Sequence, residues 1–291
     1  MKRFDMDHFN LKRCGIPTSQ ISKIATSMKK HIPIILLHVL FQLYGGIIET
    51  VSVFSTAMNK NIPALVVLPD SYKNESIKFP IIILLHGYGG NYLDWSNHSN
   101  LVDKADQFNM IIFCPDGSPN SWYLDSPIDP NSQYETFFID ELIPWIRESY
   151  RMGEIGITGL SMGGHGSLYL AIRHPELFNA VSSMSGGVDL TYSTVKWEIS
   201  NKIGSFKSYP ERWMENSVVN MVHLLNETDF PIFVDCGYDD FFIENNRDLH
   251  QKLIEAKIKH RYAEKPGGHN WNYWISALDD HLKFFQINFT K

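Results

Sequence analysis

Ser161 lies in the pentapeptide Gly159-Leu160-Ser161-Met162-Gly163, and its surroundings indicate chemistry more clearly than those of any other residue. Glycine on either side lets the backbone turn sharply from a strand into a helix, which leaves the serine side chain at the tip of the turn. Residues 154–158 alternate like a strand, and residues 167–172 continue with helical spacing. The pattern predicts a nucleophile elbow with Ser161 as the nucleophile. A glycine-rich turn that merely contains a serine is the alternative.

A serine hydroxyl becomes an effective nucleophile only beside a base that takes its proton and a carboxylate that orients the base. His269 follows Gly267-Gly268 in a loop, and Asp239-Asp240 follow the predicted strand 231–236. The order Ser, Asp, His is the one expected in an α/β-hydrolase. We assign His269 as general base and then acid, with Asp240 as its carboxylate. Asp239 remains the alternative acid, and a structural loop histidine is the alternative for His269.

The tetrahedral intermediate of acyl transfer needs two backbone donors aimed at its oxyanion. The N–H group of Met162, directly after the nucleophile, is the first candidate, and that of Tyr88 in the glycine-rich turn 86–90 is the second. A plain flexible turn is the alternative for that segment. Aromatic side chains flank these motifs and could stack on a sugar ring or an aromatic acyl group. The candidates for substrate contact are His86, Gly87, Trp122 and Trp271.

The elements needed to position these residues alternate between strand-like and helix-like patterns. Continuous apolar runs predict strands that are buried on both faces, and an alternating pair at 50–54 and 62–68 predicts an antiparallel leading edge. The remaining strands are predicted at 80–85, 110–114, 154–158, 180–184, 231–236 and 261–264. Helical periods cover 135–150, 245–256 and 271–285. The prediction is an α/β-hydrolase fold: a mostly parallel sheet with helices on both faces.

The length of 291 residues, with 44% hydrophobic and 20% charged residues, allows one large α/β domain, predicted over 47–291. Residues 187–228 are polar and lack a strong period, so we expect surface segments or a small cap there. A net charge of −6 and the lack of a long basic run argue against nucleic acid as a partner. The residues imply no metal or organic cofactor. Of the three cysteines, Cys114 and Cys236 are expected to be buried thiols, while Cys14 lies near the N-terminus.

The N-terminal part resembles an export signal behind an extension. Residues 1–27 have no assignment, and residues 28–46 combine a basic start, an apolar centre and small residues near a plausible cleavage point. Translation beginning at Met28 would give a signal peptide that is cleaved. The expectation is a secreted or periplasmic protein without stable membrane insertion. A retained anchor, a buried helix and a cytoplasmic location are the alternatives.

Several separated motifs make the resemblance to a known family specific. They are Gly159 to Gly164, Arg173-His174-Pro175, His86-Gly87, Ser121-Trp122-Tyr123, Tyr134-Glu135-Thr136 and Pro266 to Trp271. With these motifs in family order from about Glu49 to the C-terminus, the chain resembles the esterase D family of α/β-hydrolases. That family includes S-formylglutathione hydrolases, tributyrin-type esterases, and acetyl xylan and feruloyl esterases. Neither the segment before Glu49 nor residues 187–228 contains a motif that matches.

The resemblance implies a serine carboxylesterase that hydrolyses short-chain acyl or feruloyl esters through an acyl-enzyme. The flanking aromatic residues and the export signal favour a carbohydrate esterase over a cytosolic formylglutathione hydrolase, with a small-molecule or oligosaccharide ester as substrate. An acyltransferase of the mycolyltransferase type and an S-formylglutathione hydrolase-like thioesterase are the alternative enzymes. A non-catalytic binding module is disfavoured because it would not need to keep all three of Ser161, Asp240 and His269. The sequence leaves the oligomeric state open.

Overall fold

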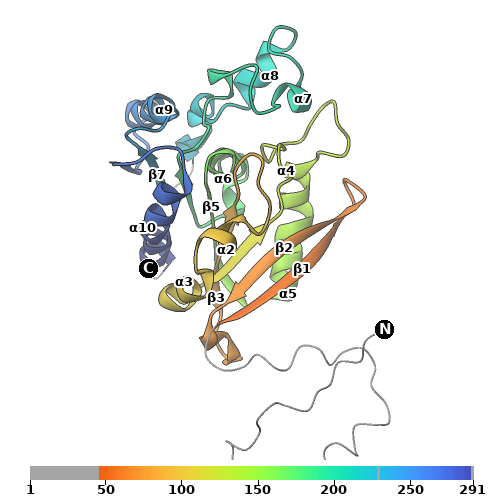
Figure 1. Cartoon of the computed structure of the whole chain (residues 1–291), viewed down its shortest axis with the longest axis vertical. Helices are drawn as coiled ribbons and strands as arrows, with labels where there is room; N and C mark the ends of the chain where they lie inside the picture. The colour runs from red at the N-terminus through yellow and green to blue at the C-terminus, as the bar shows by residue number, and fades with distance from the viewer. Residues whose placement is uncertain (1–45, 228–229, 290–291) are drawn as a thin grey trace, which may run out of the picture. The chain divides into compact units, whose positions relative to one another are not determined.

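An eight-stranded sheet forms the centre of residues 46–227 and 230–289, the part of the chain that this computed structural model describes (Figure 1). The strand order is β1-β2-β4-β3-β5-β6-β7-β8. The strands are β1 (Ile47–Ser55), β2 (Lys60–Leu68), β3 (Phe79–Leu85), β4 (Ile111–Pro115), β5 (Met152–Gly159), β6 (Ala180–Met184), β7 (Ile232–Gly237) and β8 (Arg261–Lys265). Each strand predicted from the sequence overlaps one of them.

The sheet is antiparallel at one edge and parallel elsewhere. β1 and β2 form a hairpin whose register runs from Ile47 opposite Leu68 to Ser55 opposite Lys60, which confirms the predicted leading edge. β2 also pairs antiparallel with β4, and all pairings from β4 to β8 are parallel. The carboxyl ends of parallel strands lie at one edge of a sheet, so the loops that follow β3, β5, β7 and β8 are brought together there.

Helices cover both faces of the sheet because the central strands are apolar on both sides. Ile81 and Ile83 pack in one buried cluster with residues of α5, α6 and α9, while Ile82 and Leu84 pack in a second cluster with α3 and α10. This arrangement confirms the predicted fold class. The helices are α2 (Asp94–His98), α3 (Leu101–Phe108), α4 (Tyr134–Thr136), the π-helix η3 (Phe137–Leu142), α5 (Ile143–Ser149), α6 (Met162–Arg173), α9 (Ile243–Glu255) and α10 (Trp271–Phe289), with 3₁₀ turns at η2 (Asp70–Lys73) and η4 (Pro175–Leu177).

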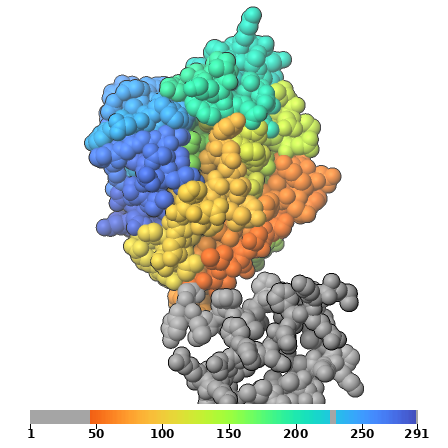
Figure 2. All heavy atoms as spheres, viewed as in Figure 1, coloured from red at the N-terminus to blue at the C-terminus, as the bar shows by residue number. Residues whose placement is uncertain are grey.

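Residues 187–227 form a small, mostly helical layer of their own. In Figures 1 and 2 these residues, coloured green to cyan, gather at one end of the domain. Its elements are η5 (Leu190–Tyr192), α7 (Ser200–Ile203), α8 (Pro210–Glu215), η6 (Val218–Asn220) and η7 (Val222–Glu227). Trp213 is fully buried in it, and its indole N–H donates to the Gly204 carbonyl at 2.9 Å. The segment therefore has a packed interior, although its sequence shows no strong period.

Two helices and one helical detail differ from the sequence-based prediction. α2 and α3 were not predicted, because each is short and lies between stronger apolar runs. The predicted helix 135–150 exists, but its middle is the π-helix η3. Cys114 and Cys236 are buried free thiols, as expected. The extension 1–27 and the predicted signal 28–46, apart from Gly46, lie outside the described residues. Among the described helices, none has the length and apolar character needed to cross a membrane.

Candidate active site

Ser161 lies at the strained turn between β5 and α6. Its φ of 56° and ψ of −114° are unusual for a residue with a side chain, and strain of this kind is typical of a nucleophile elbow. Backbone contacts hold the turn: the Ser161 N–H donates to Met184 O at 2.9 Å, and its carbonyl accepts from Gly187 at 3.1 Å. A Cβ atom on Gly163 would stand 2.6 Å from the His86 carbonyl oxygen. Glycine is thus required for this close approach.

The structure brings Ser161, His269 and Asp240 into one hydrogen-bonded chain. His269 Nε2 lies 2.9 Å from Ser161 Oγ, and its Nδ1 lies 2.9 and 3.0 Å from the two carboxylate oxygens of Asp240. In the tautomer that fits, Nδ1–H donates to the carboxylate and Nε2 accepts from the serine hydroxyl. Asp240 is buried and its Oδ1 also accepts from the Phe242 N–H at 2.8 Å. Asp239, the alternative acid, is exposed.

The two candidate oxyanion donors belong to segments that adjoin Ser161, the start of α6 and the turn after β3. Met162 begins α6, so its N–H is one of those that a helix leaves without an internal partner. The turn after β3 also approaches the elbow: a Cβ atom on Gly87 would stand 3.5 Å from Ser161 Cβ. Among the described residues, no backbone hydrogen bond is formed by the N–H of either Tyr88 or Met162. Both N–H groups therefore stay candidates for donation to the oxyanion.

Residues 55–285 match the putative esterase family. The chain belongs to this family. It is 27% identical over 256 residues to an acetyl esterase of Caldicellulosiruptor saccharolyticus, an alignment that covers 78% of this chain and 93% of the relative. It is 24% identical to the S-formylglutathione hydrolase of Mus musculus, over 82% of this chain and 93% of that protein. A solved ferulic acid esterase matches with 30% identity and a TM-score of 0.73, over 85% of this chain and all of that one.

Family membership and fold together establish a serine hydrolase that acts on carboxylic esters, with the α/β-hydrolase architecture. The resemblance stated from the sequence motifs is confirmed. The side chains that surround the triad of this esterase determine which ester can enter.

His86 does not contact substrate, contrary to the sequence-based prediction. Its ring is 1% exposed and both nitrogens are used inside the protein: Nδ1–H donates to Gly87 O at 2.8 Å, and Nε2 accepts from the Gly117 N–H at 2.8 Å. Burial lowers the pKa of this imidazole, which suits the neutral form that these two bonds require. His86 therefore shapes the turn that presents Gly87 and Tyr88.

Trp122 is also buried, so its predicted substrate contact needs correction, whereas Trp271 is half-buried and its predicted substrate contact stays a prediction. Trp122 is 2% exposed, and its indole N–H donates to the Trp197 carbonyl at 3.2 Å. Trp271 stacks on His98 with ring centres 3.9 Å apart, so that face of the indole is already covered. It is separated from His269 by Trp274, whose ring lies 5.0 Å from the imidazole. Both tryptophans support other rings.

A row of three stacked aromatic side chains that begins at His269 was not predicted. Phe241 is 45% exposed, with its ring centre 4.2 Å from that of His269. Trp197 stacks on Phe241 at 5.9 Å, and Tyr192 stacks on Trp197 at 6.2 Å. We call Tyr192, Trp197 and Phe241 the aromatic rim. Phe241 follows the predicted acid directly in the sequence, a signal that could have identified it. Trp197 lies in the segment without a motif, so nothing in its sequence context pointed to the site.

The buried carboxylate of Glu135 connects α4 to α6, the helix that follows Ser161. Glu135 accepts hydrogen bonds from Tyr169 at 2.7 Å and from Arg173 at 2.6 Å, both on α6, and His174 Nε2 lies 2.7 Å away. Burial alone raises the pKa of this carboxyl group, but the three hydrogen bonds outweigh it and lower the pKa to about 2. The ionised form is thus strongly preferred in the folded state.

Glu135→Gln is expected to lower the free energy of unfolding by about 2–3 kcal/mol near neutral pH, because the amide cannot replace the charge-assisted bonds. The folded-state pKa lies below the ordinary value of 4.5. The stabilisation is therefore complete above 4.5 and disappears as the pH falls towards about 2. Urea unfolding of both proteins at several pH values should show the difference shrinking over that range. Glu148→Gln, at an exposed position on α5, serves as control; a constant difference would contradict the assignment.

A second Asp–His pair is fully buried and cannot serve as a catalytic base for substrate. Asp235 and His281 are both fully buried, with Oδ1 and Nε2 3.3 Å apart. Lys265 Nζ lies 3.7 Å from the other carboxylate oxygen. A base must reach the proton that it removes, and the full burial of His281 prevents this. His269 differs in this respect, because its side chain is 14% exposed whereas that of His281 is fully buried.

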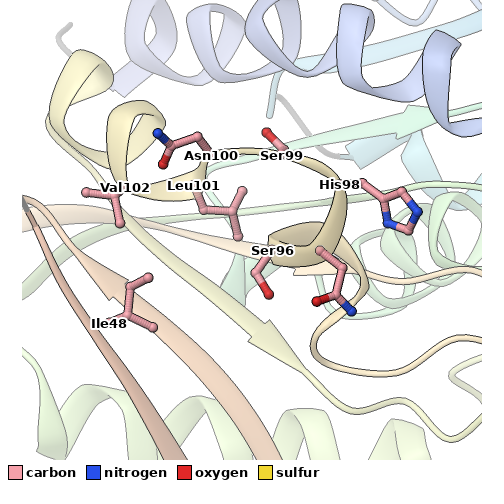
Figure 3. Close-up of a pocket in the computed structure, with 8 residues that line it drawn as sticks. Ile48, Ser96, His98, Ser99, Asn100, Leu101 and Val102 are labelled. Carbon is pink, nitrogen blue, oxygen red and sulfur yellow. The ribbon is translucent and has the colours of Figure 1, made fainter.

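A separate cavity of about 400 Å³ lies away from the triad, between the start of β1 and the turn from α2 into α3 (Figure 3). Its lining residues are Ile48, Ser96, Asn97, His98, Ser99, Asn100, Leu101 and Val102. None of the predicted site residues lines it, although His98 stacks on Trp271. Within residues 46–227 and 230–289, no group of three or more His, Cys, Asp or Glu side chains is placed to hold a metal ion.

Proposed function

We propose that this esterase removes short acyl groups, acetyl above all, or feruloyl groups from carbohydrate esters through an acyl-enzyme on Ser161. The observation that carries the proposal is the hydrogen-bonded chain Asp240–His269–Ser161 beside the aromatic rim. Planar aromatic surfaces suit both sugar rings and a feruloyl group. The acetyl esterase and ferulic acid esterase relatives support the same substrate class.

The reaction then has two halves, each with its protons accounted for. Ser161 Oγ attacks the ester carbonyl carbon while His269 Nε2 takes the hydroxyl proton, and the Tyr88 and Met162 N–H groups stabilise the oxyanion. Collapse breaks the bond to the alcohol oxygen, which receives the proton from His269. Water, deprotonated by His269, next attacks the acyl-enzyme. The carboxylic acid leaves, and the proton returns to Ser161 Oγ.

Export and domain limits belong to the same proposal. Residues 28–46 would act as a signal peptide, which would place the esterase domain 47–291 outside the cytoplasm, where polymer-bound esters are accessible. Residues 187–228 would be the cap that carries part of the substrate wall. The position of Trp197 beside Phe241 supports a role for this cap at the site.

Turnover of matched substrates tests the proposal. Purified protein from residue 47 onward would be assayed with p-nitrophenyl acetate, butyrate and octanoate, methyl ferulate, acetylated xylo-oligosaccharides and S-formylglutathione, beside Ser161→Ala as a blank. We expect hydrolysis of acetyl or feruloyl carbohydrate esters to exceed that of the long-chain ester and the thioester. Preference for S-formylglutathione, or transfer of the acyl group to added sugar instead of water, would overturn the proposed substrate or reaction.

A further inference from the structure

Two consecutive residues of the cap, Trp197 and Glu198, connect the two sides of the site. Both adopt left-handed backbone conformations, with φ of 58° and 53°, which residues with side chains rarely do. On one side, the Trp197 ring stacks on Phe241, which contacts His269. Its carbonyl accepts the Trp122 indole hydrogen bond at 3.2 Å. These contacts hold Trp197 close to His269.

Glu198 makes the connection to the opposite side. Its Oε2 accepts hydrogen bonds from the Tyr88 hydroxyl at 3.2 Å and from Asn120 Nδ2 at 2.9 Å. Tyr88 belongs to the turn that supplies the second candidate oxyanion donor. We call Glu198 with its two donors, Tyr88 and Asn120, the glutamate clasp. It connects the cap to the turn after β3, and it places an exposed carboxylate beside that turn.

The charge of this carboxylate is not neutralised by its partners, because both donors are uncharged side chains. Within the described residues, neither Glu198 nor the exposed Asp239 forms an ion pair with a basic side chain. The cation nearby is Lys196, whose Nζ lies 5.7 Å from the centre of the Trp197 ring. Lys196 is exposed and its ammonium group contacts the indole, not either carboxylate. The rim of the site is therefore acidic.

We infer that Glu198 is a specificity-determining residue: its carboxylate makes this esterase discriminate against esters that carry a negative charge and leaves neutral acyl-carbohydrate esters as substrates. The inference rests on the proposed function. Like charges close together destabilise an encounter, and the effect is screened by salt because the carboxylate is exposed. It also explains how a site with the same triad would reject a dicarboxylate thiol ester such as S-formylglutathione.

The test uses a pair of acetate esters that differ mainly in charge, p-acetoxybenzamide and p-acetoxybenzoate. The measured quantity is the ratio of kcat/KM for the neutral ester to that for the anionic ester. Glu198→Gln keeps an oxygen that can accept from Tyr88 and Asn120 but removes the charge. We expect this variant to lower the ratio about three- to fivefold at low salt, with the neutral ester changed less than about twofold. In about 1 M salt the difference between the proteins should disappear.

Two further variants separate charge from structure. Glu75→Gln changes an exposed glutamate before the amino end of β3, far along the strand from the site, and should leave the ratio unchanged. Glu198→Ala removes the clasp as well as the charge, so kcat/KM should fall for both esters. An unaltered ratio in Glu198→Gln, with neutral-ester activity intact, would overturn the inference while leaving the esterase proposal standing.

A binding measurement makes the inference independent of turnover. The dissociation constants of ferulate and of neutral ferulamide, followed by tryptophan fluorescence in a Ser161→Ala background, give the same comparison without chemistry. Adding Glu198→Gln should tighten ferulate about three- to fivefold relative to ferulamide at low salt. If Glu198→Gln tightens ferulate as expected but the protein with Ser161 intact hydrolyses no ester, the proposed function alone is wrong. If the dissociation constants of ferulate and ferulamide change equally, the inferred role of Glu198 is wrong.

Discussion

Alanine at Ser161 or at His269 is expected to lower kcat for ester hydrolysis by about 10⁴- to 10⁶-fold, the largest effect foreseen for this chain. Among residues 46–227 and 230–289, Ser161 Oγ is the only hydroxyl within hydrogen-bond distance of His269 Nε2, at 2.9 Å, and the imidazole is the group that can take its proton. Without either partner the remaining catalysis comes from the oxyanion donors and from binding. The residual rates should therefore be similar for the two variants.

The double variant gives the sharper result. Because Ser161 and His269 act as one unit, removing both should cost no more than removing either alone. Initial rates with p-nitrophenyl acetate for the two single variants and the double variant provide the comparison. His223→Ala, which removes an exposed histidine bonded to the Asn220 carbonyl, is the matched control and should keep its activity. Additive losses in the double variant would mean that the two side chains act in separate steps.

Asp240→Asn is expected to lower kcat by about 10⁴-fold, while Asp239→Asn changes it less than about twofold for a neutral ester. The two aspartates are adjacent, but only Asp240 is buried and lies within hydrogen-bond distance of His269 Nδ1. An asparagine amide at this position would favour the tautomer in which Nε2 carries the proton, so the imidazole could not accept from Ser161.

Because Asp239 is next to Asp240, the Asp239→Asn variant also serves as a control for effects on folding. Both variants lose one carboxylate from the same loop, and circular dichroism with urea unfolding would show whether each retains the fold. A pH profile of kcat/KM adds a readout that a purely structural role would not alter. If Asp239→Asn were the inactive variant, the assignment of Asp240 as the carboxylate that orients His269 would be wrong.

Much of the fold was predictable because strand and helix patterns in the core are strong. The continuous apolar run before His86 and the alternating pair at 50–54 and 62–68 each became strands of the predicted kind. α2 and α3 were missed because a helix of five or eight residues carries few periodic positions. The packing inside 187–227 was missed for a different reason: Trp213 is fully buried against Phe206 and Gly204, although the segment shows no common apolar period.

The candidate triad was predictable because glycine spacing and chain order are local properties of a sequence. The side chains around it were not, because burial decides whether an aromatic residue near a motif faces substrate or core. Trp122 belongs to a motif yet is buried, whereas Trp197 comes from a segment without motifs and stacks on the exposed Phe241. Their relation depends on contacts between segments about 75 residues apart.

The divided origin of the site also has an evolutionary and engineering consequence. The candidate nucleophile and the candidate oxyanion turn follow the central strands β5 and β3, and the candidate acid and base follow β7 and β8. Of the glutamate clasp, Glu198 comes from residues 187–227, between β6 and β7. We expect changes within residues 187–227 to alter which ester is admitted while the reactive groups keep their positions on the sheet. Libraries restricted to these residues should therefore shift the substrate range without abolishing hydrolysis.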